Sequence, residues 1–227
     1  MEIKVVRQIL EWNEDCHKEV QEELNENNVK MINIMGSPGA GKTTFILNLI
    51  DELKEMGLNV AVIEGDIEGT IDAKKIQDKG IPVVQLNTKG ACHIEAMSIK
   101  NIIHEFNLND LDLIIVENIG NLVCPAEFDI GEVVKVALLS IPEGDDKVVK
   151  YPLMFSKADA LILTKYDMIK YFKFNEDEVK KQTFLRNPNS KIFKINSLKK
   201  GEAKEFAKWL VKKILEMSII DLLKSEY

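Results

Sequence analysis

The sequence predicts an α/β fold with a largely parallel central sheet of about seven strands, helices on both faces and an N-terminal helix. Three observations predict it. Short β-branched runs alternate with amphipathic stretches from residue 29 onward, the runs are apolar almost throughout, and a glycine-rich segment follows the first run. Apolar strands alternating with helices are typical of a parallel sheet that is covered on both faces. We therefore expect ligands beyond the carboxyl ends of the strands.

Each element follows from its local pattern. Apolar residues recur at helical spacing over residues 2–27, which indicates an N-terminal helix that packs on the body. The expected strands are 29–35, 59–64, 82–86, 112–117, 135–140, 159–164 and 191–195. The expected helices are 42–56, 70–79, 93–106, 176–185 and 202–216. We interpret 1–227 as one domain, with a helical arm at 1–28, a nucleotide-binding core at 29–216 and a tail at 217–227.

Composition excludes several classes of protein. The 227 residues are 45% hydrophobic and 30% charged, which suits an ordered domain with a normal core. The formal net charge of −7 argues against general nucleic-acid binding, which needs a basic face. No apolar run is long enough to span a membrane, and the N-terminus lacks an apolar signal core, so we expect a cytoplasmic protein. Three cysteines do not make a disulfide framework.

The glycine-rich segment GSPGAGKT fits the phosphate-binding pattern G-x-x-x-x-G-K-[ST], between an expected strand and an expected helix. Its backbone N–H groups and the helix N-terminus would bind phosphate oxygens, with Lys42 on the β- and γ-phosphates and the Thr43 hydroxyl on Mg²⁺. The fold is therefore expected to be that of a P-loop NTPase. The expected phosphate contacts are Gly36, Ser37, Pro38, Gly39, Ala40, Gly41, Lys42, Thr43 and Thr44.

Acidic residues lie at the ends of two of the expected strands. Two of these residues and a glycine that follows the second of the two strands are, with Lys42, the catalytic candidates. We expect Asp66 near Mg²⁺ or the attacking water, Glu117 as a Mg²⁺ carboxylate and Gly120 as the backbone contact to the γ-phosphate. A cap or turn role is the alternative for each of them. Asn121 follows Gly120, where a water-positioning glutamine could stand, so we expect slow intrinsic hydrolysis.

The segment Thr164-Lys-Tyr-Asp167 follows a strand and resembles the guanine-binding pattern [NT]-K-x-D. Asp167 would accept hydrogen bonds from both guanine donors, which adenine does not offer as a pair, and the stem of Lys165 would cover the base. Thr164 stands where asparagine is commoner. A second loop, Ser197, Leu198 and Lys199, fits the S-x-K pattern that closes over guanine. The alternative is a solvated turn.

Soft metal ligands lie near the expected nucleotide site. Cys92 and His93 are adjacent at an expected helix start, and Cys124 follows the γ-phosphate segment. Thiolate and imidazole suit Zn²⁺ and Ni²⁺, but three ligands do not close a tetrahedral site, so water, another residue or a second subunit must complete it. Ordinary buried thiols are the alternative. Cys16 and His17 form a weaker pair, for which packing is the favoured interpretation.

Four strings, GSPGAGKT, EGDIEGTIDAKKI, NTKGACHIEA and ENIGNLVCPAEFDIGE, in this order resemble the hydrogenase nickel-incorporation GTPases, the HypB family. The resemblance implies a GTPase that binds GTP, GDP and Mg²⁺, dimerises with nucleotide and helps deliver nickel to [NiFe]-hydrogenase. It implies the nickel-binding protein HypA and the hydrogenase large-subunit precursor as partners. It places an interfacial Ni²⁺ or Zn²⁺ site at Cys92, His93 and Cys124, and the nucleotide site at 36–43, Asp66, Glu117, Lys165 and Asp167.

Other functions stay open at this point. A sister accessory GTPase for urease or a cobalamin enzyme shares the phosphate loop, although the strings around residues 92 and 117–132 speak against it. An ATP-using kinase or ligase would not need Thr164-Lys-Tyr-Asp167. A metal-binding scaffold with little turnover would not need an intact Lys42-Thr43 pair.

Overall fold

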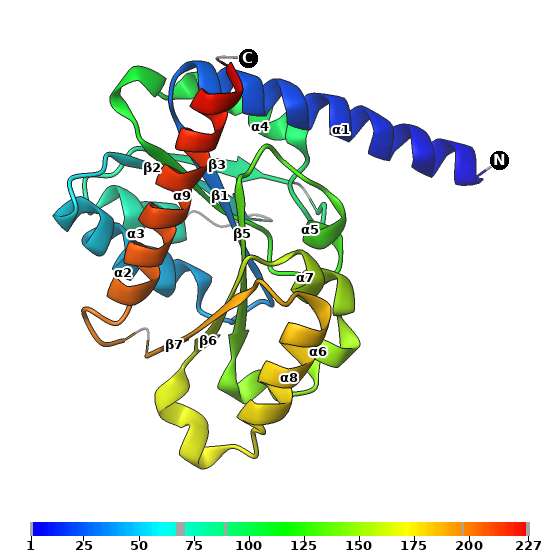
Figure 1. The fold of residues 1–227 in the computed structure, drawn as a ribbon, viewed down its shortest axis with the longest axis vertical. Coiled ribbons are helices and arrows are strands. Elements are labelled where there is room, and N and C mark those ends of the chain that lie inside the picture. The colour runs from blue at the N-terminus through cyan, green and yellow to red at the C-terminus, as the bar shows by residue number, and fades with distance from the viewer. Residues whose placement is uncertain (1, 67–70, 89, 197, 226–227) are drawn as a thin grey trace.

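A single seven-stranded sheet forms the centre of the computed structural model, which describes residues 2–66, 71–88, 90–196 and 198–225, with backbone alone at 2–10, 71 and 219–225. All neighbouring strands are parallel, in the order β3-β2-β4-β1-β5-β6-β7 (Figure 1). The strands are β1 (Lys30–Gly36), β2 (Val60–Asp66), β3 (Val83–Asn87), β4 (Leu113–Glu117), β5 (Val134–Ser140), β6 (Ala160–Thr164) and β7 (Lys191–Ile195). The predicted parallel α/β sheet is confirmed.

Helices cover both faces of this sheet (Figure 1). Alternate residues of β1 show why: Ile32 and Ile34 join the buried cluster under α2 and α9, whereas Met31 and Met35 point into two clusters on the opposite face. The helices are α1 (Glu2–Glu26), α2 (Lys42–Glu55), α3 (Ile71–Gln77), α4 (Ala96–Ile102), α5 (Cys124–Glu127), α6 (Lys147–Lys150), α7 (Pro152–Lys157), α8 (Glu176–Arg186) and α9 (Lys204–Ser225). In the described part of the chain, no helix combines the length and apolarity needed to cross a membrane.

Three helical expectations need correction. The helix expected at 93–106 begins only at Ala96, because Glu95 is extended (φ −101°, ψ 154°), and it ends in a 3₁₀ turn at Ile103–Glu105. Cys92 and His93 therefore lie in the loop before the helix. The last helix does not end at 216 but continues to Ser225, since no glycine or proline interrupts it. The short helices α5, α6 and α7 were not predicted, because four to six residues are too few for a helical periodicity.

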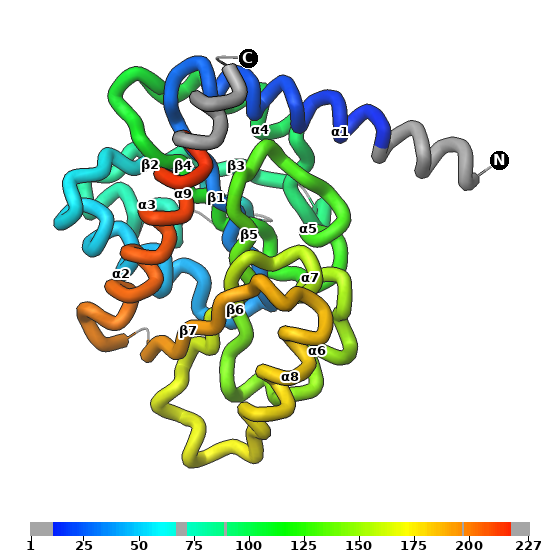
Figure 2. Tube along the Cα trace, viewed as in Figure 1, coloured from blue at the N-terminus to red at the C-terminus, as the bar shows by residue number. Residues whose placement is uncertain are grey.

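The N-terminal helix packs on the body, as predicted. Val20 and Leu24 are buried in one cluster with residues of α4 and of strands β1, β2 and β4, and the trace in Figure 2 shows α1 alongside α4. The helix also approaches Gly131, whose φ of +102° lies in the left-handed region. A Cβ at Gly131 would lie 2.4 Å from Cγ1 of Val20. Glycine is thus required there by both backbone conformation and helix docking.

Gly131→Ala tests this packing. We expect the free energy of unfolding to fall by about 2–4 kcal/mol, because a positive φ and a clash with Val20 add together. Gly57→Ala is the matched control, since Gly57 has a φ of +83° but no atom within 4 Å of the added Cβ. The control should lose about 1–2 kcal/mol. Urea denaturation measures both, and equal losses would contradict the docking of α1 on Gly131.

Candidate nucleotide and metal sites

The phosphate loop joins β1 to α2 with its backbone open to a ligand. Gly39 and Gly41 have φ of +75° and +91°, and a Cβ on either would meet no atom within 4 Å. The Lys42 ammonium turns back to the loop and donates to the carbonyl oxygens of Gly36 and Ser37 at 3.4 and 3.3 Å. These are long hydrogen bonds for a buried ammonium, so phosphate oxygens would be better acceptors. The loop therefore has the cradle that the sequence motif predicts.

A cavity of about 290 Å³ opens beside this loop, at the carboxyl ends of β2 and β4. It brings together the predicted catalytic residues Lys42, Asp66, Glu117 and Gly120, and it adds the carboxylates of Glu64 and Asp72, which were not predicted as site residues. The Thr43 hydroxyl donates to Glu117 Oε1 at 2.8 Å. A hydroxyl and several carboxylates are the hard oxygen ligands that Mg²⁺ prefers, so the donors present fit that ion.

The charges in this cavity are buried without full compensation. Burial raises the pKa of Glu117 to about 7 and, together with the neighbouring Glu117 and Asp66, raises the pKa of Glu64 to about 8. Burial also lowers the pKa of Lys42, against the opposing pull of Glu117. In the described part of the chain, Oε2 of Glu64 and Oε2 of Glu117 are buried without a hydrogen-bond partner. A bound cation would supply the missing partner and return both carboxyls to the ionised form.

The loop after β4 lies directly on the phosphate loop. A Cβ at Gly120 would come within 2.8 Å of the Pro38 nitrogen, so only glycine fits this approach. The next residue, Asn121, donates its backbone N–H to the Gly36 carbonyl at 3.1 Å. Its side-chain oxygen accepts from the Val123 N–H at 2.7 Å, and its amide nitrogen lies 3.7 Å from the Cys124 sulfur. The backbone and side-chain contacts of Asn121 thus connect the phosphate loop to Cys124.

The predicted base-binding residues flank the phosphate loop on its other side. The Thr164 hydroxyl donates to the Ala40 carbonyl at 2.6 Å, and the Lys165 ammonium donates to the Gly39 carbonyl at 2.7 Å. Thr164 is fully buried, so the threonine serves as a tether between β6 and the phosphate loop. Asp167 is exposed at the same edge. Leu198 and Lys199 follow β7, and Ser197 lies outside the described residues.

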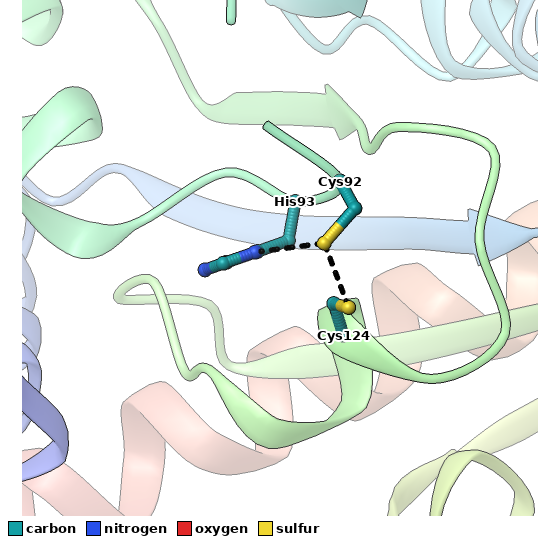
Figure 3. Close-up of side chains that lie close together, drawn as sticks. All are labelled: Cys92, His93 and Cys124. Carbon is teal, nitrogen blue, oxygen red and sulfur yellow. Dashed lines mark hydrogen bonds between the residues drawn. The ribbon is translucent and has the colours of Figure 1, made fainter. Parts of the chain in front are cut away.

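The predicted metal ligands also meet in space (Figure 3). Cys92 and His93 come from the loop before α4, and Cys124 is the first residue of α5. The Cys92 thiol contacts the Cys124 sulfur at 2.7 Å and His93 Nδ1 at 3.6 Å. The ligand atoms of these three side chains all lie within 4.8 Å of one another. Two sulfurs and an imidazole at this spacing fit Ni²⁺ or Zn²⁺.

The pKa values and hydrogen bonds of His93 and Cys124 are those expected of a site that binds a cation. Burial lowers the pKa of His93, and its Nε2 is buried without a hydrogen-bond partner among the described residues, with the nearest carboxylate oxygen, of Glu95, at 3.6 Å. The imidazole ring stacks on Phe128 with centroids 4.0 Å apart. The hydrogen bond from Cys92, followed by burial, raises the pKa of Cys124 to about 11. A metal ion would lower it again, so binding would release protons.

The other soft pair does not form such a site. Cys16 is buried, and burial raises the pKa of its thiol. His17 uses Nδ1 to accept a hydrogen bond from the Gly131 N–H at 2.8 Å. Both residues face the body of the protein from α1, as the packing interpretation expects.

Comparison with known proteins gives one consistent family. Residues 30–194 match the family model "CobW/HypB/UreG, nucleotide-binding domain". The hydrogenase/urease maturation factor HypB of Helicobacter pylori strain J99 is 39% identical over 216 residues, which are 93% of this chain and 88% of that protein. The chain belongs to the HypB family.

Solved structures of the HypB family agree. The crystal structure of Helicobacter pylori HypB in complex with nickel superposes with a TM-score of 0.85 at 37% identity, covering 91% of this chain and 96% of that one. The HypB structure from Archaeoglobus fulgidus gives a TM-score of 0.81 at 30% identity, with coverage of 89% and 98%. The resemblance inferred from the four sequence strings is therefore confirmed.

Sequence reasoning missed two carboxylates that line the cavity beside the phosphate loop. Glu64 could have been found, because a carboxylate inside the apolar run VAVIE is unusual for a buried strand. Asp72 lies on α3 and reaches both the cavity beside the loop and a second one of about 380 Å³ that contains Thr43 and Lys165. Nothing in its local sequence marks it.

The raised carboxyl pKa values give a stability prediction. In nucleotide-free protein without Mg²⁺, a carboxyl whose pKa rises from 4.5 to about 8 keeps a proton that the unfolded chain loses. Stability should therefore fall as the pH rises through this window. Glu64→Gln should flatten the slope, raising Tm at pH 8 and leaving it unchanged near pH 5. Thermal unfolding in EDTA measures this, with exposed Glu55→Gln as control. Parallel slopes for all three proteins would show that Glu64 is not protonated by burial.

A second prediction concerns the tether from β6. Thr164→Val keeps the side-chain size but leaves the Ala40 carbonyl without its donor. We expect the affinities for GDP and GTP to fall equally, by about threefold to tenfold, or about 0.5–1.5 kcal/mol. Thr164→Ser keeps the hydroxyl and should bind like the parent protein. Titration with a fluorescent nucleotide measures this, and an equal loss in both variants would argue against the hydrogen bond as the cause.

Proposed function

We propose that this protein is a GTP-hydrolysing nickel chaperone of hydrogenase maturation, in which the nucleotide state controls the affinity of a metal site at Cys92, His93 and Cys124. Membership of the HypB family, whose Helicobacter pylori relative was crystallised with nickel, supports the class of function. The observation that carries the coupling is the loop after β4, which contacts the phosphate loop at Gly120 and Asn121 and begins α5 at Cys124.

Each residue has a defined task in this proposal. The loop at 36–43 and the N-terminus of α2 hold the phosphates, with Lys42 on the terminal pair, while Asp167 selects guanine. Thr43, Asp66 and Glu117 would hold Mg²⁺, which offsets the charge that develops on the phosphates. Water attacks the γ-phosphorus, the bond between that phosphorus and the β-phosphate oxygen breaks, and the products are GDP and inorganic phosphate. Since Asn121 takes the place of a water-positioning glutamine, intrinsic turnover is slow.

The metal part of the cycle follows from linkage. A γ-phosphate that draws Gly120 toward it moves the chain that leads to Cys124, so nickel affinity differs between the GTP and GDP states. Three ligands from one chain leave the site open. A second copy of the chain would complete it, which makes a GTP-dependent homodimer the expected metal-bound form. HypA and the hydrogenase large-subunit precursor are the proposed donor and recipient proteins, and Zn²⁺ is the proposed alternative occupant.

A second recipient is also worth testing. The Helicobacter relatives are named hydrogenase/urease maturation factors. In this alternative, the same nucleotide cycle delivers nickel to urease.

Nickel titration in two nucleotide states tests the coupling. With a non-hydrolysable GTP analogue and Mg²⁺, we expect nickel to bind more tightly than with GDP, by about 5- to 150-fold, which corresponds to a coupling of about 1–3 kcal/mol. Calorimetry combined with size-exclusion chromatography measures affinity and dimerisation in the same samples. Equal affinity and equal stoichiometry in both states would eliminate the coupling.

Cysteine variants test the ligand assignment separately. Cys92→Ala and Cys124→Ala should each lose most of the bound nickel, measured by metal analysis after gel filtration. Cys16→Ala removes a thiol that is buried under α1 and should keep it. Lys42→Ala should abolish GTP hydrolysis but preserve nickel binding without nucleotide. If neither ligand variant loses nickel, the metal site is elsewhere.

A further inference from the structure

Two loops that are far apart in the sequence carry the proposed metal ligands. We call residues 92–96 the first ligand segment, which holds Cys92 and His93, and residues 118–132 the second ligand segment, which holds Cys124. Neither segment contains a named strand, and the bridge between Gly36 and Asn121 does not reach the first ligand segment, so strand pairing does not fix the distance between the two segments. Their spacing must come from side chains that bind both.

Asn118 makes the inner connection. Its side-chain oxygen accepts from the Ile119 N–H at 2.9 Å in its own segment and from the Ile94 N–H at 3.4 Å in the first ligand segment. Its amide nitrogen donates to Asn33 on β1 at 3.1 Å, and Asn33 donates in turn to the buried Glu132 at 3.0 Å. Asn118 is 1% exposed and belongs to the loop after β4, two residues before Gly120. A change at Asn118 would thus disturb the nucleotide site as well.

Asn13 makes the outer connection, and it comes from α1. Its side-chain oxygen accepts from the Ala96 N–H at 2.9 Å, at the end of the first ligand segment. Its amide nitrogen donates to the Asp129 carbonyl at 2.8 Å, in the second ligand segment. One carboxamide therefore uses its acceptor on one segment and its donor on the other. Asn13 is 8% exposed, so water does not readily replace these partners.

The rest of α1 fixes where this carboxamide lies. His17, one helical turn after Asn13, accepts from the Gly131 N–H at 2.8 Å, and Val20 packs against the same glycine. Asparagine is a poor residue for a helix interior, and both of its hydrogen bonds leave the helix. Helix stability therefore does not explain asparagine at this position, whereas a bridge between two loops does.

We propose that Asn13 is a positioning residue for the metal centre: through one carboxamide, the N-terminal helix holds both ligand segments at the spacing at which Cys92, His93 and Cys124 meet. The proposal rests on the metal site of the proposed function. Ala96 lies three residues after His93 and Asp129 five residues after Cys124, so each hydrogen bond acts close to its ligands. Groups that orient metal ligands from outside typically contribute about 10- to 100-fold to metal affinity.

The spacing of the thiols can be measured without nickel. Phenylarsine oxide binds two thiols at once and releases one water, so its affinity for the metal-free full-length protein reports how well Cys92 and Cys124 are held together. We expect Asn13→Ala to weaken arsenical binding and nickel binding by about tenfold each. GDP affinity should change by less than about twofold, because Asn13 contacts no residue of the phosphate loop among its hydrogen bonds in the described structure.

Asn27→Ala is the matched control. Asn27 follows the same helix and donates its amide to the Glu23 carbonyl at 2.8 Å, away from both ligand segments. The control should bind the arsenical and nickel like the parent protein. The rate at which a one-thiol reagent alkylates Cys92 should be similar in all variants, because this reaction does not depend on the distance between two sulfurs.

Asn13→Asp covers the case in which the alanine variant does not fold. Aspartate keeps the size and the acceptor for the Ala96 N–H but turns a carboxylate oxygen toward the Asp129 carbonyl, which repels it, so arsenical affinity should fall by at least about tenfold, as in Asn13→Ala. Arsenical affinities in the Asn13 variants that equal those of Asn27→Ala would overturn the proposal. If instead the parent protein binds no nickel, the proposed function fails, and the arsenical comparison still decides the role of Asn13.

Discussion

The contact between the loop after β4 and the phosphate loop is the constraint on which the rest of this site depends. Gly120 leaves no room for a side chain against Pro38, and Asn121 is paired with Gly36 by a main-chain hydrogen bond. Cys124 follows Asn121 by three residues, so a displacement of this loop at Gly120 would be passed through a short stretch of backbone to that cysteine. The proposed coupling needs no long pathway through the core, since one short loop both contacts the phosphate loop and carries Cys124.

The two candidate sites also share one electrostatic property: each contains a group whose pKa is raised. In the nucleotide cavity, burial raises the pKa values of Glu64 and Glu117, and in the metal site the neighbouring thiol and burial raise that of Cys124. Each group is therefore held partly in its protonated form until a cation arrives. In the proposed function, binding of Mg²⁺ and of nickel would release these protons. Each ion would also give a partner to atoms that are buried without one among the described residues, Oε2 of Glu64 and of Glu117 in one site and Nε2 of His93 in the other.

What could be predicted from the sequence is what lies close together along the chain. The seven strands and the phosphate loop follow from local period and from eight contiguous residues, and the structure places each strand within a residue or two of its expected range. The metal trio was predicted from residue types and from the resemblance to HypB. Glu64 was recognisable in principle, but Asn13 and Asn118 were not, because their partners are backbone groups that only the tertiary fold brings near.

The two halves of the phosphate loop are held by different kinds of contact. On the base side, buried Thr164 at the end of β6 donates to Ala40, and Lys165, the residue after β6, donates to Gly39, so two side chains hold this half of the loop. On the other side, the contacts to Gly36 and Pro38 come from the backbone of a loop outside any strand. The held side is already arranged before nucleotide binds, which lowers the entropic cost of binding. We therefore expect a displacement caused by the γ-phosphate to occur mainly on the β4 side, toward the proposed metal ligands.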